Sequence, residues 1–492
     1  MSRFSRGSGI LLHPTSIPSE YGIGDLGENL IKFLELLKDN AQKYWQILPI
    51  GPTGYGDSPY QSLSSFAGNP LLISIDDLIA QNLISSSNLN EKFNTRYINF
   101  AKVKKFKFKI LKEASRNFDY SNPNFQAFKK TNNDWLSGYS TYMALKEAHS
   151  ELPWYLWDSK YRDPVSSSVS KFQNEFSFKI DFHDFTQYIF YEQWSKIKMY
   201  AKNHGISIIG DLPIFVAHDS ADVWLNQSLY FLNSDRTLKY QAGVPPDYFS
   251  STGQLWGNPL YNWEFEYVKI YDFWLSRIKN SLNLVDILRL DHFRGFDAYW
   301  CVPGKDQNAI NGTWKKGPGR DFFHHINDKL GDLPFIAEDL GFITESVKEL
   351  RDNFQFPGMK ILHYAFSDTQ DSKNEFLPHN YSPNCVVYIG THDNDTTIGW
   401  WGNQSEEIKN HVLNYSNSTQ NDIISIFLEL ASSSKAAISI FTLQDIMRLD
   451  TTHRMNLPGT SEGNWQWRFK FEDLNLDYMA QLKQLTIENK RS

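Results

Sequence analysis

The feature that most constrains the fold of this chain is a series of eight short apolar runs, most of which end in a polar or charged residue. The runs cover residues 8–12, 44–50, 206–209, 285–290, 335–337, 359–362, 386–391 and 436–443. Amphipathic helical patterns precede several of them, at 185–204, 268–282 and 321–330. Alternating apolar strands and helices are typical of a parallel sheet with helices outside. Eight such strands favour a (β/α)8 TIM barrel over an open doubly wound sheet, although both folds place functional side chains at the carboxyl ends of strands.

The length of 492 residues leaves ample sequence beyond the roughly 250 residues that a barrel needs. We therefore expect residues 1–492 to form a single α/β catalytic domain with inserted helical and loop subdomains. The helical periodicity of residues 65–185 predicts a mostly helical insertion between the second and third strands. Residues 220–265 predict a loop-rich insertion between the third and fourth strands, because the stretch 241–253 is rich in Gly and Pro and has an aromatic tip. We expect this second insertion to cover the active site.

The charge and composition exclude several classes of protein. A net charge of −7 gives no long-range attraction for nucleic acid or for an anionic membrane. Six lysines between Lys102 and Lys112 lie at helical spacing with apolar residues, which predicts a solvated helix face. The two cysteines supply neither a disulfide framework nor a zinc quartet. No signal-type segment and no apolar run of about 18 residues is present, so the expected location is the cytoplasm.

Aromatic residues are unusually frequent. The chain has 15 Trp, 25 Tyr and 35 Phe, which together make up 15% of it. Aromatic faces suit the apolar faces of sugar rings, but they are equally good core material. The composition therefore favours a carbohydrate-binding protein but does not by itself determine the function.

The segment 289–295 carries the first candidate for chemistry. Residues two apart on a strand face the same way, so Arg289 and Asp291 should project together into the barrel mouth. A neighbouring guanidinium lowers the pKa of a carboxyl and keeps it ionised, as a nucleophile requires. A structural ion pair is the alternative for an isolated pair of this kind.

Two further strand ends carry carboxyls. Glu338 closes the apolar run 335–337, and apolar surroundings raise a carboxyl pKa towards general-acid duty, although Glu338 could instead cap the following helix. The segment 390–396 holds His392, Asp393 and Asp395, whose spacing fits no common metal motif. Asp291, Glu338 and Asp393 thus offer the carboxylate pair that glycoside chemistry needs, with a third to hold sugar hydroxyls.

One glycine-rich segment resembles a phosphate-binding loop but is not expected to bind phosphate. Residues 51–58 have the glycine spacing of a phosphate-binding loop, but Asp57 occupies the lysine position. A negative charge there repels phosphate.

At these motifs the chain resembles the amylomaltases of glycoside hydrolase family 77, within the α-amylase clan. The resemblance runs from Arg6 to about Phe469 and rests on the blocks 6–16, 54–62, 210–214, 244–249, 257–259 and 455–465. It implies a barrel without a C-terminal β-sandwich, and the residues after Trp465 are expected to form only a terminal helix. It also implies an enzyme that works without metal or cofactor.

The resemblance implies roles for individual residues. Asp291 resembles the nucleophile, Glu338 the general acid/base and Asp393 the group that grips the sugar at the point of cleavage. The resemblance implies that the donor sugar is contacted by Arg289, Asp211, His292 and His392, and the acceptor by Ser58 and Tyr60. Tyr248 and Phe249 are expected at the tip of the loop over the site. Further glucan contacts are expected from Gln254, Trp256 and Asn464.

The expected function is that of a retaining 4-α-glucanotransferase. The implied substrates are malto-oligosaccharides, amylose and glycogen- or starch-derived glucans, with glucose as an acceptor. One alternative is an α-1,4-glucan hydrolase on the same barrel. A non-catalytic glycan-binding scaffold is a second, but a binder has no need for three carboxylates.

Overall fold

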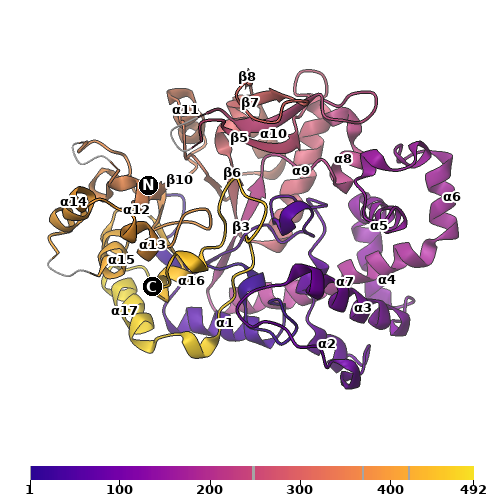
Figure 1. The fold of residues 1–492 in the computed structure, drawn as a ribbon, viewed down its shortest axis with the longest axis horizontal. Helices are drawn as coiled ribbons and strands as arrows, with labels where there is room; N and C mark the ends of the chain where they lie inside the picture. Colours follow the sequence, from indigo (N-terminus) through magenta and orange to yellow (C-terminus); the bar gives the residue numbers. More distant parts are fainter. Residues whose placement is uncertain (1, 247–249, 368–370, 419–421) are drawn as a thin grey trace.

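The eight apolar runs form a closed parallel barrel in the computed structural model, which describes residues 2–246, 250–367, 371–418 and 422–492 (Figure 1). The barrel strands are β1 (Gly7–Leu11), β2 (Tyr44–Gln46), β3 (Ser207–Pro213), β6 (Ile287–Asp291), β9 (Phe335–Ala337), β10 (Gly358–Ile361), β11 (Cys385–Tyr388) and β12 (Ile438–Thr442). Each strand pairs with its neighbours in chain order, and β1 pairs with β12 to close the ring. The predicted (β/α)8 barrel is confirmed.

Helices surround the barrel because its strands are apolar on both faces and need cover outside as well as inside. The covering helices are α1 (Glu28–Asp39), α7 (Ser177–Asn203), α9 (Tyr267–Leu284), α10 (Gly319–Leu330), α11 (Glu345–Asn353), α13 (Thr397–Gly402), α14 (Glu406–Ser416) and α15 (Ile423–Ser433). Short helices α12 (Leu362–Ala365) and α16 (Leu443–Ile446) directly follow β10 and β12. The helices predicted at 185–204, 268–282 and 321–330 are present as α7, α9 and α10. Gly205, with φ +71°, follows the first of them.

Between β2 and β3 the chain forms a helical region on one side of the barrel, at the right of Figure 1. It comprises α2 (Ile75–Ala80), α3 (Phe100–Asn117), α4 (Pro123–Thr131), α5 (Asn133–Ala148) and α6 (Ser167–Glu175), of which the last four pack on α7. The lysine-rich segment forms the predicted amphipathic helix, α3, but Lys107 lies on its buried face. That side chain is 0% exposed, and its Nζ donates to the Ile73 carbonyl at 2.7 Å.

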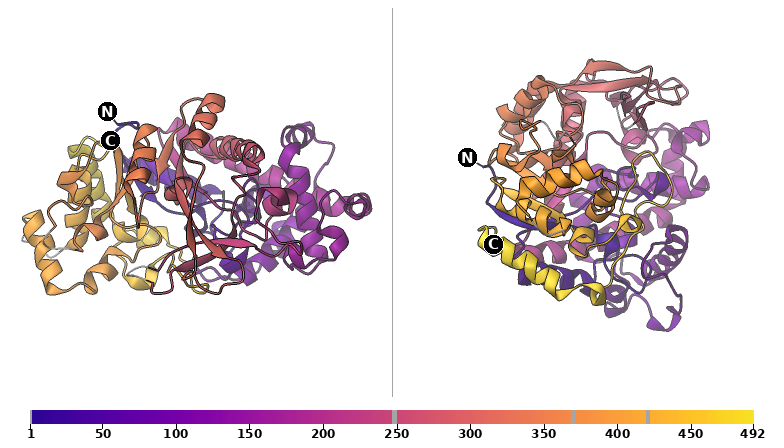
Figure 2. Two further views of the ribbon diagram at one scale, coloured as in Figure 1. Left: turned by 90° about the horizontal axis from the view of Figure 1, so that it is seen from above. Right: turned by 60° about the vertical axis from the view of Figure 1, so that its left-hand side comes forward.

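A second sheet was not predicted. Its four antiparallel strands have the order β5–β4–β7–β8, with β4 (Tyr240–Val244), β5 (Gln254–Pro259), β7 (Ala298–Pro303) and β8 (Thr313–Lys316). Figure 2 shows this sheet standing apart from the barrel strands. The interpretation of 220–265 as loop therefore needs correction, since it contains β4, β5 and the short helix α8 (Ala221–Leu225). The division of the chain into one catalytic domain with two insertions stays a prediction.

The two ends of the chain lie on the same side of the molecule (Figures 1 and 2). The last helix, α17 (Leu476–Glu488), is the predicted terminal helix. Arg491 follows it and is fully buried, donating to the carbonyls of Gly7 in β1 and Ala437 before β12 at 3.2 and 3.1 Å. A buried guanidinium thus ties the C-terminal segment to the amino ends of the two strands that close the barrel. Within the described ranges, no helix has the length and apolarity needed to cross a bilayer.

Close approach of β1 and β2 leaves no room for a side chain at Gly9, and this gives a test of the packing. A Cβ at Gly9 would lie 2.2 Å from the carbonyl oxygen of Tyr44, so backbone would have to move. We expect Gly9→Ala to lower the free energy of unfolding by about 1–3 kcal/mol, measured by urea denaturation. Gly402→Ala is the control, because nothing lies within 4 Å of a Cβ there. Equal effects of the two substitutions would contradict the packing described.

Candidate active site

A shared guanidinium links the ends of β3 and β6. The two strands pair in parallel with Asp211 opposite Arg289, so both side chains point into the barrel mouth. Arg289 Nη1 donates to Asp211 Oδ2 at 2.6 Å and to Asp291 Oδ1 at 2.9 Å. The same-side projection predicted from the two-residue spacing is present, and the pairing is a bridge between two carboxylates rather than an isolated pair.

Glu338 lies directly against the backbone that follows Asp291. Its Oε2 accepts from the backbone N–H of His292 at 2.7 Å, and its Oε1 from that of Leu340 at 3.1 Å. His292 has φ 52° and ψ 50°, a left-handed conformation that is uncommon for a non-glycine residue and that turns this N–H towards Glu338. Glu338 does not cap the following helix, because α11 begins after Thr344. Its hydrogen bonds instead join the β6 and β9 strand ends.

Asp393 follows β11 and faces the same space. Its Oδ1 accepts from Asn456 Nδ2 at 2.7 Å, and its Oδ2 lies 3.3 Å from His392 Nε2. The side chain remains 45% exposed, so it is held in place while part of the carboxylate stays open to solvent. That combination suits a group that accepts hydrogen bonds from a ligand.

Tyr60 connects the two halves of the site from the segment after β2. Its hydroxyl donates to Asp211 Oδ2 at 2.7 Å and lies 2.8 Å from His392 Nε2, and its ring stacks on His392 at 5.4 Å. Burial raises the pKa of Tyr60 well above its ordinary value, and the charges of Asp211, Asp291 and Asp393 raise it further. The Tyr60 hydroxyl thus interacts electrostatically with carboxylates at the ends of three different strands.

The pKa of Asp291 is shifted in the direction opposite to the prediction, whereas the pKa of Glu338 is shifted as predicted. Arg289 lowers the pKa of Asp291 as predicted, but burial and the charges of Asp211 and Glu338 outweigh it, and the net shift is upward. The prediction that Arg289 holds the pKa of Asp291 down is therefore wrong, because burial of the carboxyl raises its pKa by more than Arg289 lowers it. Burial also raises the pKa of Glu338, as predicted, against the lowering by Arg289. Since the two carboxyls repel each other, the pair holds a proton to higher pH than two isolated carboxyls would.

The predicted contacts His292, Gln254 and Trp256 lie together on one side of the site. The Trp256 ring meets the His292 ring edge to face at 4.8 Å, and Trp256 Nε1 lies 3.3 Å from Gln254 Oε1. His292 Nε2 is buried and has no hydrogen-bond partner, and burial lowers the pKa of His292 to about 3. A neutral imidazole with an unpaired nitrogen is suited to bind a hydroxyl group.

Other predicted contacts are less directly placed. Ser58 is half-buried, and its Oγ accepts from the Tyr60 backbone N–H at 3.2 Å, so it shapes the turn that presents Tyr60. The Asn464 amide is used within its own loop, where it accepts from Leu457 N at 2.8 Å and donates to the Thr460 carbonyl at 2.9 Å. The loop-tip residues Tyr248 and Phe249 lie outside the described residues.

Sequence reasoning missed Tyr364 and Asn456. The hydroxyl of Tyr364, after β10, accepts a hydrogen bond at 3.2 Å from Nδ2 of Asn394, the residue that follows Asp393, and burial raises its pKa together with the charges of Asp393 and Glu338. Asn456 donates to Asp393, as described above. The available signals were the end of the run 359–362 for Tyr364 and the block 455–465 for Asn456, but nothing in either segment specified the partner.

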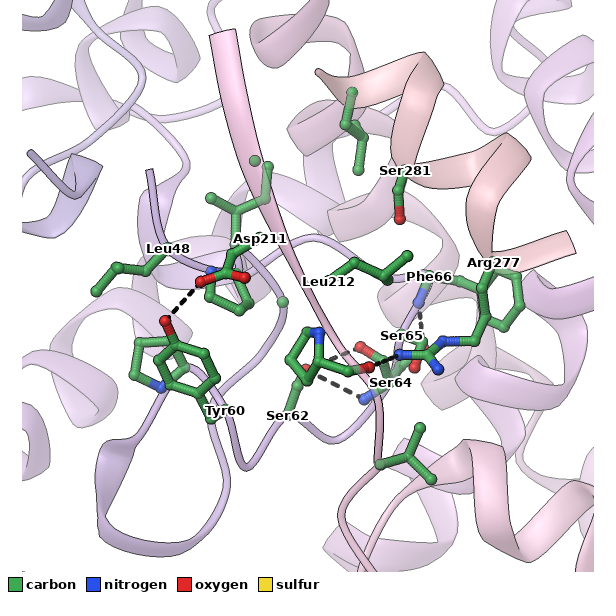
Figure 3. Close-up of a pocket in the computed structure, with 18 of the residues that line it drawn as sticks. Leu48, Tyr60, Ser62, Ser64, Ser65, Phe66, Asp211, Leu212, Arg277 and Ser281 are labelled. Carbon is green, nitrogen blue, oxygen red and sulfur yellow. Dashed lines mark hydrogen bonds between the residues drawn. The ribbon is translucent and has the colours of Figure 1, made fainter. Parts of the chain in front are cut away.

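A cavity of about 80 Å³ lies behind Tyr60 and Asp211, between the barrel and α9 (Figure 3). Figure 3 shows the Tyr60 hydroxyl pointing to Asp211 on one side and Arg277 among Ser64 and Ser65 on the other. Its lining is mainly apolar, and it is smaller than the few hundred Å³ of ordinary ligand sites. We interpret this cavity as a packing space behind the site.

Among the residues that the structure describes, no three His, Cys, Asp or Glu side chains lie close enough to hold a metal ion. The positive group at the site is the Arg289 guanidinium, between Asp211 and Asp291. The arrangement offers two partly buried carboxyls with raised pKa values, a third carboxylate and several fixed hydrogen-bonding groups at one barrel mouth. A (β/α)8 barrel with such a site belongs to the class of enzymes that cleave or transfer glycosidic bonds.

Comparisons with known proteins identify the family within that class. A family model of the glycoside hydrolase 77 group, described as 4-alpha-glucanotransferase, matches residues 12–475. The 4-alpha-glucanotransferase of Synechocystis is 46% identical over 96% of this chain and 95% of its own length, and that of Thermus thermophilus is 41% identical over 99% of both. The structure of amylomaltase from Streptococcus agalactiae in complex with acarbose superposes with a TM-score of 0.96 at 38% identity, covering 99% of this chain and 100% of that one. The chain belongs to the 4-α-glucanotransferase family, as its motifs predicted.

Proposed function

We propose that Asp291 is the nucleophile, Glu338 the general acid/base and Asp393 the group that holds the sugar at the point of cleavage. The observation that carries this proposal is the hydrogen bond from His292 N to Glu338, which fixes the acid/base beside the backbone of the nucleophile. We place the proton of the pair on Glu338, because the Arg289 guanidinium bonds directly to Asp291 at 2.9 Å whereas the bonds to Glu338 come from backbone N–H groups.

In the first step Asp291 attacks the anomeric carbon of an α-1,4-linked glucan. The bond to the leaving oxygen breaks, and Glu338 gives that oxygen its proton. The glucosyl unit is then held as an ester of Asp291, and Glu338 is a carboxylate. The buried pair, with one proton between two carboxyls, has the charge state from which this step begins.

In the second step Glu338 takes the proton from the 4-hydroxyl of an acceptor glucan or of glucose. The acceptor oxygen attacks the anomeric carbon, the ester bond to Asp291 breaks, and both carboxyls regain their initial states. Two displacements give net retention of configuration.

The remaining predicted contacts are assigned by position. Arg289, Asp211, His292 and His392 hold the donor sugar, and Tyr60 joins them to the acceptor side through its bonds with Asp211 and His392. Trp256, with Gln254 beside it, stacks on glucan, while Ser58 and Asn464 act by fixing the loops that carry Tyr60 and residues 457–464. For Tyr248 and Phe249 we keep the role expected from the sequence, which is to stack on the acceptor and exclude water in favour of transfer.

The enzyme acts on α-1,4-glucans, as its family does. Malto-oligosaccharides, amylose and glycogen- or starch-derived glucans as donors, and glucose as an acceptor, are proposed for this chain. Independence of metal and cofactor, and a cytoplasmic location, also remain predictions.

Incubation with maltotriose distinguishes transfer from hydrolysis. We expect release of glucose and formation of longer malto-oligosaccharides, with a nearly constant total of reducing ends, because each broken glycosidic bond is replaced by another. Chromatography of the products together with a reducing-end assay measures both quantities. A steady rise in reducing ends would identify a hydrolase, and unchanged maltotriose would identify a glycan-binding scaffold.

A further inference from the structure

An exposed aromatic surface lies beside the catalytic strand ends and is not used by the site described above. It consists of Trp314 in β8 and Phe342 in the segment between β9 and α11, and is called the Trp314–Phe342 platform below. Trp314 is 37% exposed and Phe342 is 70% exposed. Large apolar side chains at this exposure leave surface that water solvates poorly, and adjacent aromatic rings of this kind commonly mark binding sites.

Arg294 joins the two halves of the platform. Its guanidinium lies 3.7 Å from the centre of the Trp314 ring and 5.7 Å from that of Phe342. It also donates to the carbonyl of Phe342. Arg294 is itself buried, so the contact with Trp314 supports the ring from beneath and leaves the exposed surface of the indole facing solvent.

Trp300 fixes Trp314 from the side. The two residues pair across β7 and β8, and their rings meet nearly edge to face at 5.1 Å. Trp300 is held in turn by a hydrogen bond from its Nε1 to the Ala309 carbonyl at 2.8 Å. The Trp314 ring is therefore held in place before any ligand arrives, which lowers the entropy cost of binding.

The platform is continuous with the catalytic centre along the chain. Arg294 is three residues after Asp291, and Phe342 is four residues after Glu338. Even a fully extended backbone places Phe342 within about 14 Å of Glu338. Phe342 is therefore within a few glucose lengths of the catalytic carboxyls.

We propose that the Trp314–Phe342 platform binds the part of a long α-1,4-glucan that extends beyond the catalytic subsites. Sugar rings present apolar C–H faces that stack on exposed aromatic rings. A long chain bound at both places gains affinity that a short oligosaccharide cannot obtain, because a short one does not reach the platform. This inference rests on the proposed function, since it assigns further binding energy to the same substrate class.

The test compares a long and a short substrate. We expect Trp314→Ala and Phe342→Ala each to raise KM for amylose by about three- to tenfold, and to raise KM for maltotriose much less. Phe178→Ala is the matched control, because Phe178 is 65% exposed but lies at the start of α7 in the helical region, and it should change neither value. Phe342 is largely exposed, so its substitution should not affect folding. Phe342→Ala therefore tests the binding role of the platform even if Trp314→Ala impairs folding.

Two outcomes would overturn the inference. One is an unchanged KM for amylose in Phe342→Ala, and the other is an equal change in KM for amylose and maltotriose. Failure of the proposed function is distinguishable from both, because the wild-type enzyme would then not redistribute glucose units in either substrate.

Discussion

Substitution of Asp291 by asparagine is expected to lower kcat for glucan transfer by at least about 10⁴-fold. Asparagine keeps the shape of the side chain but lacks the charge and nucleophilicity needed to form the glucosyl ester. The Arg289 guanidinium keeps Asp211 as its second partner, at 2.6 Å, so the fold should be retained. Initial rates of glucose release from maltotriose measure the effect, and the thermal unfolding midpoint reports the fold.

Asp297→Asn is the matched control for this substitution. Asp297 has the same side chain and lies shortly after the catalytic strand, but it accepts a hydrogen bond from Ser346 at 2.8 Å and does not face Arg289 or Glu338. It should keep nearly full activity. Retention of more than a few per cent of kcat by Asp291→Asn would exclude Asp291 as the nucleophile.

Substitution of Glu338 by glutamine is expected to lower kcat with natural glucans by about 10²–10⁴-fold. Glutamine cannot protonate the leaving oxygen. A donor such as maltosyl fluoride needs no such proton, so formation of the glucosyl ester from it should be largely restored in the variant. Rapid measurement of fluoride release tests this difference. Equal losses with both donors would contradict the role of Glu338 as the acid.

The pH dependence of the wild-type enzyme follows from the same carboxyl. Burial raises the pKa of Glu338, so the acid form persists to higher pH than for an ordinary glutamate. As pH rises through this pKa the proton is lost, and kcat/KM for maltotriose should fall on the alkaline side. As pH falls and the pair takes a second proton, Asp291 loses its charge and kcat/KM should fall again.

The alkaline fall should be absent for fluoride release by Glu338→Gln, whereas the surface variant Glu349→Gln should keep the wild-type profile. A wild-type kcat/KM that stayed constant from neutral to strongly alkaline pH would show that no shared proton is needed.

The barrel could be predicted because its strands leave a strong signal. A strand buried on both faces must be apolar throughout, and β9 to β12 are buried along their whole length. The second sheet leaves no such signal, since all four residues of β8 are exposed and β4 contains Gly243. These strands can be identified only from the strands with which they pair, and not from their own composition.

The site divides in a similar way. The common orientation of Arg289 and Asp291 follows from the geometry of one strand, and was predicted. The bond from Tyr60 to Asp211, the left-handed turn at His292 and the bond from Asn456 to Asp393 depend on how distant segments pack. The upward shift of the pKa of Asp291 was missed for the same reason, because the burial of this carboxyl and its closeness to Asp211 and Glu338 are visible only once the strands are paired.

Mass spectrometry of Glu338→Gln after incubation with maltosyl fluoride tests the central claim most directly, since slow turnover of the ester in this variant allows it to accumulate. After proteolysis, the peptide that contains Asp291 should carry one maltosyl group, and the double variant with Asp291→Asn should carry none. A maltosyl group on another residue, or consumption of the donor without any adduct, would contradict a double displacement through Asp291.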